Sequence, residues 1–203
     1  RGEARAGRLG TVIVVTGPTG NVGAQLVRLL EERGVEHRTA AHHPPAGGVR
    51  LDYDDRATWG PALDGVTRLF LLFPLPTPRA VDRRILPFLE AAVAAGCEHV
   101  VYLSVFGGDT QRLIPHHRVE RAIEAAPVTH TILRCSYFMQ NMFRAISTHG
   151  VDIAERGELF VPAGKGRITF LDARDAAAVA LDALVGSFVH GGEPSAPAAP
   201  ARK

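Results

Sequence analysis

The sequence is poor in lysine and cysteine, and it has no long apolar run. Of its 203 residues only two are lysines, Lys165 and Lys203, and the formal net charge is +2. This small charge argues against nucleic acid as a partner through bulk attraction. No run reaches the ~18 apolar residues of a membrane span, so we expect no membrane partner. The two cysteines, Cys97 and Cys135, lie in apolar surroundings without metal-ligand spacing. We therefore expect reduced thiols, no bound metal and a cytoplasmic location.

What is present is a regular alternation of strands and helices. Apolar runs such as 67–73 and 99–104 are typical of strands buried on both faces, and the segments 79–95 and 115–126 have helical spacing. Strands and helices alternate roughly every 25–30 residues, which predicts an α/β fold with a doubly wound, mostly parallel sheet, the Rossmann fold. We expect one domain over residues 10–190, with disordered tails at 1–9 and 191–203. Further along, the pattern predicts a helix over 137–148, a strand within 164–171 and a helix over 172–185.

The most informative stretch is a glycine-rich turn between a predicted strand at 11–16 and a predicted helix at 20–33. It reads Gly17-Pro-Thr-Gly20-Asn-Val-Gly23. In a dinucleotide-binding turn the first glycine allows the sharp exit from the strand, the second lets backbone approach a pyrophosphate, and the third lets the helix sit close to the sheet. The free N–H groups and the positive dipole end at the helix N-terminus attract the phosphates. Thr19, Asn21 and Val22 belong to the same predicted cofactor site. The alternative is a turn that binds nothing.

The end of the second predicted strand indicates which nucleotide binds. NAD-binding units usually carry an acidic residue there, whereas this chain has Ala41 or His42. Basic or neutral donors lie nearby instead: Arg38, His42, His43 and Arg50. They would suit a 2′-phosphate, so we expect NADP, with NAD less favoured, although the histidines could simply be solvated loop residues. Asp52 could border the adenine or serve as a turn residue, and Phe73 ends another strand at the same edge of the sheet.

Four stretches resemble one protein family. They are Thr16-Gly-Pro-Thr-Gly-Asn-Val-Gly23, Leu51-Asp-Tyr-Asp-Asp55 with the strand region 63–72, Thr131-Ile-Leu-Arg-Cys-Ser-Tyr-Phe-Met-Gln-Asn141, and Phe170-Leu-Asp-Ala-Arg-Asp-Ala-Ala-Ala-Val-Ala180. In this order they resemble the NmrA-like branch of the atypical short-chain dehydrogenases/reductases. The resemblance implies an NADP-preferring Rossmann domain. Some members of that family reduce quinones or other small carbonyl compounds, and others are redox sensors that bind the cofactor without turnover.

Two departures from the family pattern affect the expected chemistry. No Tyr-x-x-x-Lys pair is present, and His116, four residues before Glu120, stands where many members carry Lys or His before a Glu. The chain also turns into Pro and Ala where the family continues into a substrate-covering lobe. We therefore expect a reduced C-terminal lobe, with a pocket that is either open or completed by another subunit of a homo-oligomer.

Three residues are candidates for catalysis. Helical spacing places His116 beside the core stripe of its helix and His117 on the wet side. His116 could bond the nicotinamide ribose or deliver a proton, or it could form a surface pair with Glu120. Ser104 could bond a substrate carbonyl or cap its loop, and Tyr137 could donate a proton. For Asp172 we prefer an N-cap role to a catalytic one.

Together these features predict an NADP-dependent oxidoreductase of a small organic carbonyl or quinone substrate, with secondary metabolism as one setting. Two alternatives stay open: a non-catalytic NADP-binding sensor or regulator, and a fold-derived cyclase or isomerase without hydride transfer.

Overall fold

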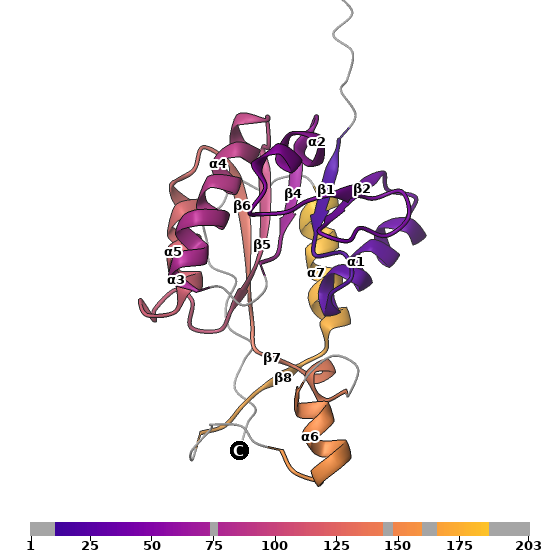
Figure 1. Ribbon diagram of the computed structural model, residues 1–203, viewed down its shortest axis with the longest axis vertical. Coiled ribbons are helices and arrows are strands. Elements are labelled where there is room, and N and C mark those ends of the chain that lie inside the picture. The colour runs from indigo at the N-terminus through magenta and orange to yellow at the C-terminus, as the bar shows by residue number, and fades with distance from the viewer. Residues whose placement is uncertain (1–10, 74–76, 144–147, 160–165, 187–203) are drawn as a thin grey trace, which may run out of the picture.

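The computed structural model describes residues 11–73, 77–143, 148–159 and 166–186 (Figure 1). Both predicted tails lie outside these ranges. The strands of the main sheet are β1 (Ile13–Thr16), β2 (His37–Ala41), β3 (Val49–Arg50), β4 (Arg68–Leu71), β5 (His99–Val105) and β6 (Thr129–Cys135). The helices are α1 (Asn21–Glu32), α2 (Trp59–Leu63), α3 (Pro78–Ala80), α4 (Leu86–Ala94), α5 (Pro115–Ala125), α6 (Thr148–Arg156) and α7 (Ala173–Val185).

The six strands form one parallel sheet in the order β3-β2-β1-β4-β5-β6. This is the doubly wound order, and it confirms the predicted fold class. In the centre, Val15 of β1 pairs with Thr39 on one side and Phe70 on the other. The strand order reverses between β1 and β4. Ligands of such sheets bind beyond the carboxyl ends of the strands at this reversal, which is where the glycine-rich turn begins.

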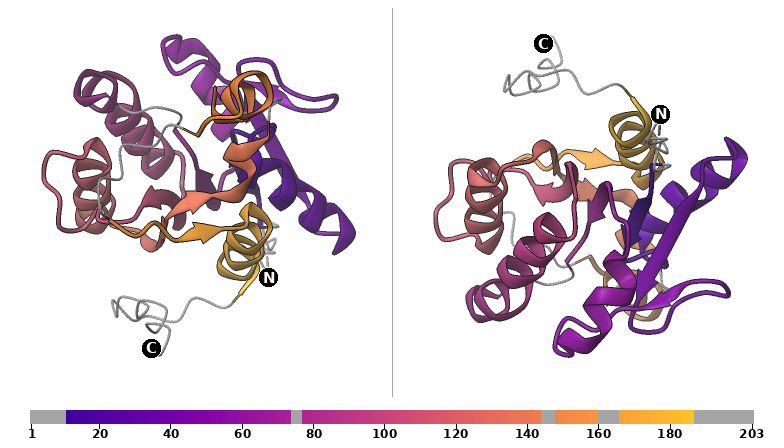
Figure 2. Two further views of the ribbon diagram at one scale, coloured as in Figure 1. Left: turned by 90° about the horizontal axis from the view of Figure 1, so that it is seen from below. Right: turned by 90° about the horizontal axis from the view of Figure 1, so that it is seen from above.

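Helices cover both faces of the sheet, and Figure 2 shows the two groups on either side of it. On one face α1 and α7 lie side by side, packing Leu26 and Leu181 against Val15 and Phe70. The other face packs against α2, α4 and α5. Because successive residues of a strand point to opposite faces, each central strand must be apolar at every position. This explains the continuous apolar run at 67–73.

The helix predicted over 79–95 forms as one continuous segment with a π-helical turn at Val81–Ile85 between α3 and α4. Pro87 follows this turn and has no N–H to donate to the preceding turn of the helix. A local change of hydrogen-bond register is one way in which a helix accommodates such a gap. The turn carries Arg84, whose side chain reaches the cleft described below.

The prediction of a helix over 137–148 is wrong. Tyr137–Phe138 form a short strand, β7, which pairs in parallel with β8 (Phe170–Leu171), and a 3₁₀ turn follows at Met139–Met142. Helix α6 begins only at Thr148. The pairing partner of β7 lies more than thirty residues away, and local periodicity carries no information about it. The strand predicted within 164–171 is β8, at Phe170–Leu171, while residues 164 and 165 lie outside the described residues.

Within the described ranges, no helix combines the length and the apolar character needed to cross a bilayer.

Candidate functional site: a cleft at the glycine-rich turn

At two positions of the glycine-rich turn, Gly17 and Gly23, neighbouring atoms lie so close that a Cβ would collide with them. Gly17 has φ +64°, a left-handed conformation that disfavours side chains, and a Cβ there would collide with the Leu72 side chain. A Cβ at Gly23 would run into the carbonyl oxygen of Gly17 and approach Pro18. The predicted role of Gly23 therefore needs correction: it lets α1 lie against the turn itself, rather than against the sheet.

Gly20 differs from the other two glycines. A Cβ there would meet only the Gly17 oxygen at 3.4 Å and Leu72 Cδ2 at 3.8 Å, which are ordinary contacts. Packing inside the protein therefore does not require glycine at this position, although Gly20 lines a cleft. Gly20 is also the N-cap of α1 and has no side chain to satisfy the free N–H groups of the first helical turn. These features fit a ligand that comes close to the backbone and accepts hydrogen bonds from it.

The cleft has a volume of about 370 Å³ and lies at the carboxyl ends of β1, β2 and β4. The predicted cofactor residues that line it are Gly17, Thr19, Gly20, His42, Asp52 and Phe73. Other lining residues include Thr16, Tyr53, Asp54, Leu72 and Arg84. The remaining three predicted cofactor residues are not among those that line it: Val22 is buried in the core, Gly23 lies against the turn, and Asn21 hydrogen-bonds the side chain of Asn141.

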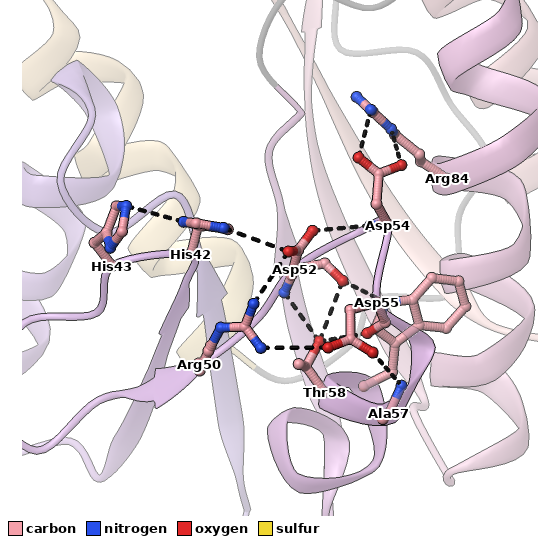
Figure 3. Close-up of polar contacts among 10 residues, drawn as sticks. His42, His43, Arg50, Asp52, Asp54, Asp55, Ala57, Thr58 and Arg84 are labelled. Atoms are coloured by element: carbon pink, nitrogen blue, oxygen red, sulfur yellow. Dashed lines mark hydrogen bonds and ion pairs between the residues drawn. The ribbon is translucent and has the colours of Figure 1, made fainter.

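Asp52 lines the cleft and is held there by several polar contacts (Figure 3). Its backbone N–H donates to Thr58 Oγ1 at 3.0 Å, and its carbonyl accepts from the Trp59 indole at 3.0 Å. Its carboxylate lies 3.3 Å from His42 Nε2 and 3.2 Å from Arg50 Nη2. Asp52 is thus both a turn residue and a cleft residue, and it gathers two basic side chains around one carboxylate.

The basic residues near the second strand divide into two groups. His42, His43 and Arg50 lie together with Asp52, and His42 Nδ1 is 3.0 Å from His43 Nε2. Arg38 does not join them, because its guanidinium donates to the carbonyl of Asp64 at 2.6 Å and to that of Ala62. The expectation that Arg38 contributes to this site is wrong, since the side chain fastens β2 to the end of α2.

An aromatic wall closes the cleft on the side of β4. The rings of Tyr53 and Phe73 meet edge to face with centroids 5.3 Å apart. The Tyr53 hydroxyl donates to the Leu72 carbonyl at 3.2 Å, and burial raises the pKa of Tyr53 above its ordinary value. The phenol therefore stays protonated and acts as a fixed part of the wall. Flat apolar walls of this kind suit a nucleobase.

Ser104 is placed differently from the expectation that it bonds a substrate. The residue is 2% exposed, and its hydroxyl donates to the carboxylate of Glu120, which is fully buried. The other oxygen of Glu120 accepts from Arg134 Nε at 3.1 Å and Nη2 at 3.0 Å. A Cβ at Gly108 would collide with Glu120 Oε1, so the loop after β5 closes tightly over this network. Ser104 joins β5, α5 and β6 here, and its hydroxyl hydrogen is engaged.

The two histidines of α5 also depart from the helical-wheel expectation. His117 is not on a wet face, since its Nδ1 lies 2.8 Å from the Gly108 carbonyl. His116 does not form a surface pair with Glu120, because that carboxylate is buried and bonded to Ser104 and Arg134. Burial lowers the pKa of His116, and the nearby charge of Glu120 opposes the shift.

His116 Nδ1 is buried and has no hydrogen-bond partner within the described part of the chain. The imidazole lies against the ring of Tyr102, with centroids 6.2 Å apart. A neutral imidazole suits a hydrogen bond better than the delivery of a proton at neutral pH.

Tyr137 lies two hydrogen bonds away from the glycine-rich turn. Asn21, the first residue of α1, donates through Nδ2 to Asn141 Oδ1 at 3.3 Å, and the Asn141 side chain in turn bonds Tyr137. Burial raises the pKa of Tyr137, so the phenol keeps its proton at neutral pH. Among the described residues there is no cluster of three metal-ligand side chains.

Comparisons with known proteins agree with this geometry. No family model matches the sequence. The chain is 31% identical to the NAD(P)H azoreductase of Xenophilus azovorans over 186 residues, covering 85% of this chain and 63% of the relative. It is 30% identical to the uncharacterized oxidoreductase YesF of Bacillus subtilis, over 88% of this chain and 62% of the relative. Among solved structures, the NADPH complex of an NADPH-dependent quinone oxidoreductase from Escherichia coli superposes with a TM-score of 0.71 at 24% identity, over 87% of this chain and 65% of the other.

These relatives and structures are consistent with the NmrA-like branch of the atypical short-chain dehydrogenases/reductases, which the sequence motifs resemble. The chain spans less than two thirds of the length of these curated relatives. The family's Asp-x-Arg-Asp segment has a structural role here, as expected. Asp172 is the N-cap of α7 and accepts from the Arg174 N–H at 2.8 Å.

Sequence reasoning missed Arg84, which comes from a helix whose spacing indicated only a covering role, yet it lines the cleft and bonds Asp54. No periodic signal marks this residue. Glu120 was expected in a surface pair with His116, but it is fully buried. Outside the cleft, Gln140 bonds both Asp172 and the N–H of Ala173.

Proposed function

We propose that the chain is the cofactor-binding part of an NADP(H)-dependent reductase. The observation that carries the proposal is a single cleft that joins the glycine-rich turn to the basic group around Asp52. Gly17, Gly20 and His42 all line this cleft. A dinucleotide carries phosphate at both places, as a pyrophosphate in the middle and a 2′-phosphate on the adenosine ribose.

The residues present fit this cofactor. The N–H groups of the first turn of α1 would hold the pyrophosphate, and Gly20 leaves room for it beside the backbone. His42 and its neighbours would face the 2′-phosphate, while Tyr53 and Phe73 would flank the adenine. When bound, the nicotinamide supplies the hydride. The protein contributes position, exclusion of water and a route for the proton.

Tyr137 is the side chain that we propose for proton supply. Its phenol is protonated at neutral pH, and through Asn141 it is coupled to the first residue of α1. Ser104 is a weaker candidate because its hydroxyl hydrogen is engaged by Glu120. His116 would serve as a hydrogen-bond partner of the ribose rather than as an acid, since burial favours its neutral form.

The proposed substrate is a small organic carbonyl or quinone compound. The names of the relatives support this class, since one is an azoreductase and a structural neighbour is a quinone oxidoreductase. The two free, buried cysteines, Cys97 and Cys135, support a cytoplasmic location. Completion of the substrate pocket by a second subunit belongs to the same proposal.

A non-catalytic NADP sensor is the second candidate. Two observations favour it: the sequence has no Tyr-x-x-x-Lys pair, and Ser104 is tied to a buried carboxylate. The polar groups that promote turnover in the wider superfamily are therefore reduced to Tyr137 and His116. A sensor would bind NADPH without oxidising it.

Calorimetric titration with NADPH, NADP⁺ and NADH tests cofactor binding, and loss of nicotinamide absorbance with a panel of quinones tests turnover. We expect NADPH to bind more tightly than NADH and to be oxidised. Tyr137→Phe should lower kcat about 10²-fold, the lower end of the range for general acids, without changing NADPH affinity. Tyr102→Phe is the matched control, since the Tyr102 hydroxyl is buried with no hydrogen-bond partner among the described residues. Tight binding without turnover would favour the sensor, and no binding would refute both.

A further inference from the structure

The side chain of Asn141 lies between the first turn of α1 and the proposed proton donor, Tyr137. Its oxygen accepts a hydrogen bond from Asn21 Nδ2 at 3.3 Å, and the same side chain bonds the Tyr137 hydroxyl. Asn21 is the first residue of α1, so its backbone N–H belongs to the free groups proposed to hold the pyrophosphate. A single amide therefore links the proposed cofactor site to the proposed proton donor.

The bond from Asn21 determines which way the Asn141 amide faces. A side-chain amide accepts through its oxygen and donates through its nitrogen. Because the oxygen of Asn141 is turned toward Asn21, the nitrogen is turned toward the Tyr137 hydroxyl. The phenol oxygen then accepts this hydrogen bond, and the phenolic hydrogen is not given to Asn141. Burial raises the pKa of Tyr137 and the bond from Asn141 opposes that shift, as a bond donated to the oxygen does.

Other contacts hold the ring of Tyr137. Tyr137 pairs with Phe170 across β7 and β8, and the two rings meet edge to face with centroids 5.6 Å apart. The ring of His149, from α6, lies 5.7 Å away between centroids. Tyr137 is half-buried, so part of the residue stays open to solvent. These contacts act on the ring and on the hydroxyl oxygen, and they leave the hydroxyl hydrogen to a substrate.

From this geometry we propose that Asn141 is a positioning residue of the reductase, which accepts from Asn21 and donates to Tyr137 and so keeps the phenolic hydrogen available to the substrate. The inference rests on the proposed function and deepens it. In the proton step the O–H bond of Tyr137 breaks and a bond forms from the proton to the substrate oxygen, while the carbonyl group takes up the hydride that NADPH loses on oxidation to NADP⁺. The phenolate later recovers a proton from water.

The same amide stabilises the phenolate that this step leaves behind. A hydrogen bond donated to an ionised oxygen is stronger than one donated to a neutral oxygen. The bond from Asn141 therefore strengthens as negative charge develops on the Tyr137 oxygen, which is where a fixed donor lowers the barrier. Asn141 itself gains and loses no proton.

The test replaces the amide by a group of nearly the same shape that cannot donate. In Asn141→Asp the carboxylate still accepts from Asn21, but it also accepts the phenolic hydrogen of Tyr137. We expect kcat with a quinone acceptor, followed by loss of nicotinamide absorbance, to fall about tenfold, or about 1.4 kcal/mol, the scale of one hydrogen bond. Saturating NADPH removes any effect of the added charge on cofactor binding from this comparison.

A second background separates positioning from general damage to the fold. In Tyr137→Phe there is no phenolic hydrogen to keep available, so adding Asn141→Asp should change kcat by less than twofold. A structural defect would instead lower kcat in both backgrounds. Asn141→Ala removes the bond to the phenol without adding charge, and it should show the same pattern if the carboxylate variant does not fold.

Gln140→Ala is the matched control. Gln140 is the preceding residue in the same 3₁₀ turn, and its bonds of 2.8 and 2.9 Å go to Asp172 and Ala173 rather than to Tyr137. This variant also loses polar contacts between the turn and a helix of the core. It should nevertheless keep kcat within twofold of wild type.

The outcomes separate this inference from the proposed function. A tenfold loss in Asn141→Asp that disappears in the Tyr137→Phe background supports the inference. An unchanged kcat in Asn141→Asp, equal losses in both backgrounds, or full activity in Tyr137→Phe overturns it and leaves NADPH-dependent reduction intact. A wild-type protein that oxidises NADPH with no acceptor refutes the proposed reductase and this inference with it.

Discussion

Removing the guanidinium of Arg134 would leave the carboxylate of Glu120 fully buried without its charged partner. Arg134→Met keeps most of the apolar stem and removes two hydrogen bonds of 3.1 and 3.0 Å. Truncating one partner of a buried ion pair costs roughly 3–5 kcal/mol. The Arg134 side chain is 25% exposed, so water can partly replace it, and we expect the lower end, about 3 kcal/mol. For a chain of this length that corresponds to a fall in Tm of about 6–12 °C.

Urea denaturation followed by circular dichroism measures this deficit relative to wild type. Arg121→Met is the matched control, since its surface pair with Glu124 on the same helix is worth about 0.5 kcal/mol or less. A deficit in Arg134→Met no larger than that of the control would refute the reasoning. Adding Glu120→Gln to Arg134→Met should recover part of the loss, because the charge is then gone from both sides.

Three further predictions concern other parts of the molecule. Gly23→Ala should destabilise the fold by about 2 kcal/mol or more in thermal melts, because the added Cβ would collide with the backbone of the turn. Gly20→Ala should change the stability by no more than about 0.5 kcal/mol in the same melts, but it should weaken NADPH binding in calorimetry. Burial lowers the pKa of His99 to about 4, so the native imidazole is neutral near pH 6.5. The free energy of unfolding should fall by about 2–3 kcal/mol between about pH 6.5 and about pH 4, because in this range mainly the unfolded chain binds the proton. In His99→Gln the free energy of unfolding, measured in urea, should depend less on pH across that range. Gln140→Ala removes bonds of 2.8 and 2.9 Å to Asp172 and Ala173 and should cost about 1–2 kcal/mol, measured in urea, without changing NADPH affinity.

The parallel sheet was predictable because its central strands, such as β4 and β5, are largely apolar on both faces and the strands alternate with helices. The glycine-rich turn was predictable because local backbone conformation requires a glycine, as at Gly17 with its φ of +64°. The N-cap role of Asp172 was local too, since a cap depends on residues two or three positions away. Each of these features is decided within about one turn of helix or one strand.

The polar contacts between distant elements were not predictable in the same way. Ser104, Glu120 and Arg134 come from three different elements, and nothing local to any of them indicates that they meet. Helical spacing placed His117 on the solvent side because the spacing reflects only the helix itself. In the structure the loop carrying Gly108 contacts the His117 side chain. The periodicity of a helix predicts which face is apolar but not which loop covers the polar one.

The segment after β6, which was wrongly predicted as a helix, makes polar contacts with two distant helices. Predicted as part of a helix, residues 137–142 instead form β7 and a 3₁₀ turn that reaches two helices at once. Asn141 bonds the first residue of α1, while Gln140 bonds the N-cap of α7. These two helices already pack side by side on one face of the sheet, so the segment fixes their N-terminal ends in the same place. Tyr137 is linked to this segment through Asn141, and its ring also lies edge to face against Phe170 of β8, with centroids 5.6 Å apart. Its position relative to the glycine-rich turn therefore depends on the start of α1 as well as on the pairing of β7 with β8.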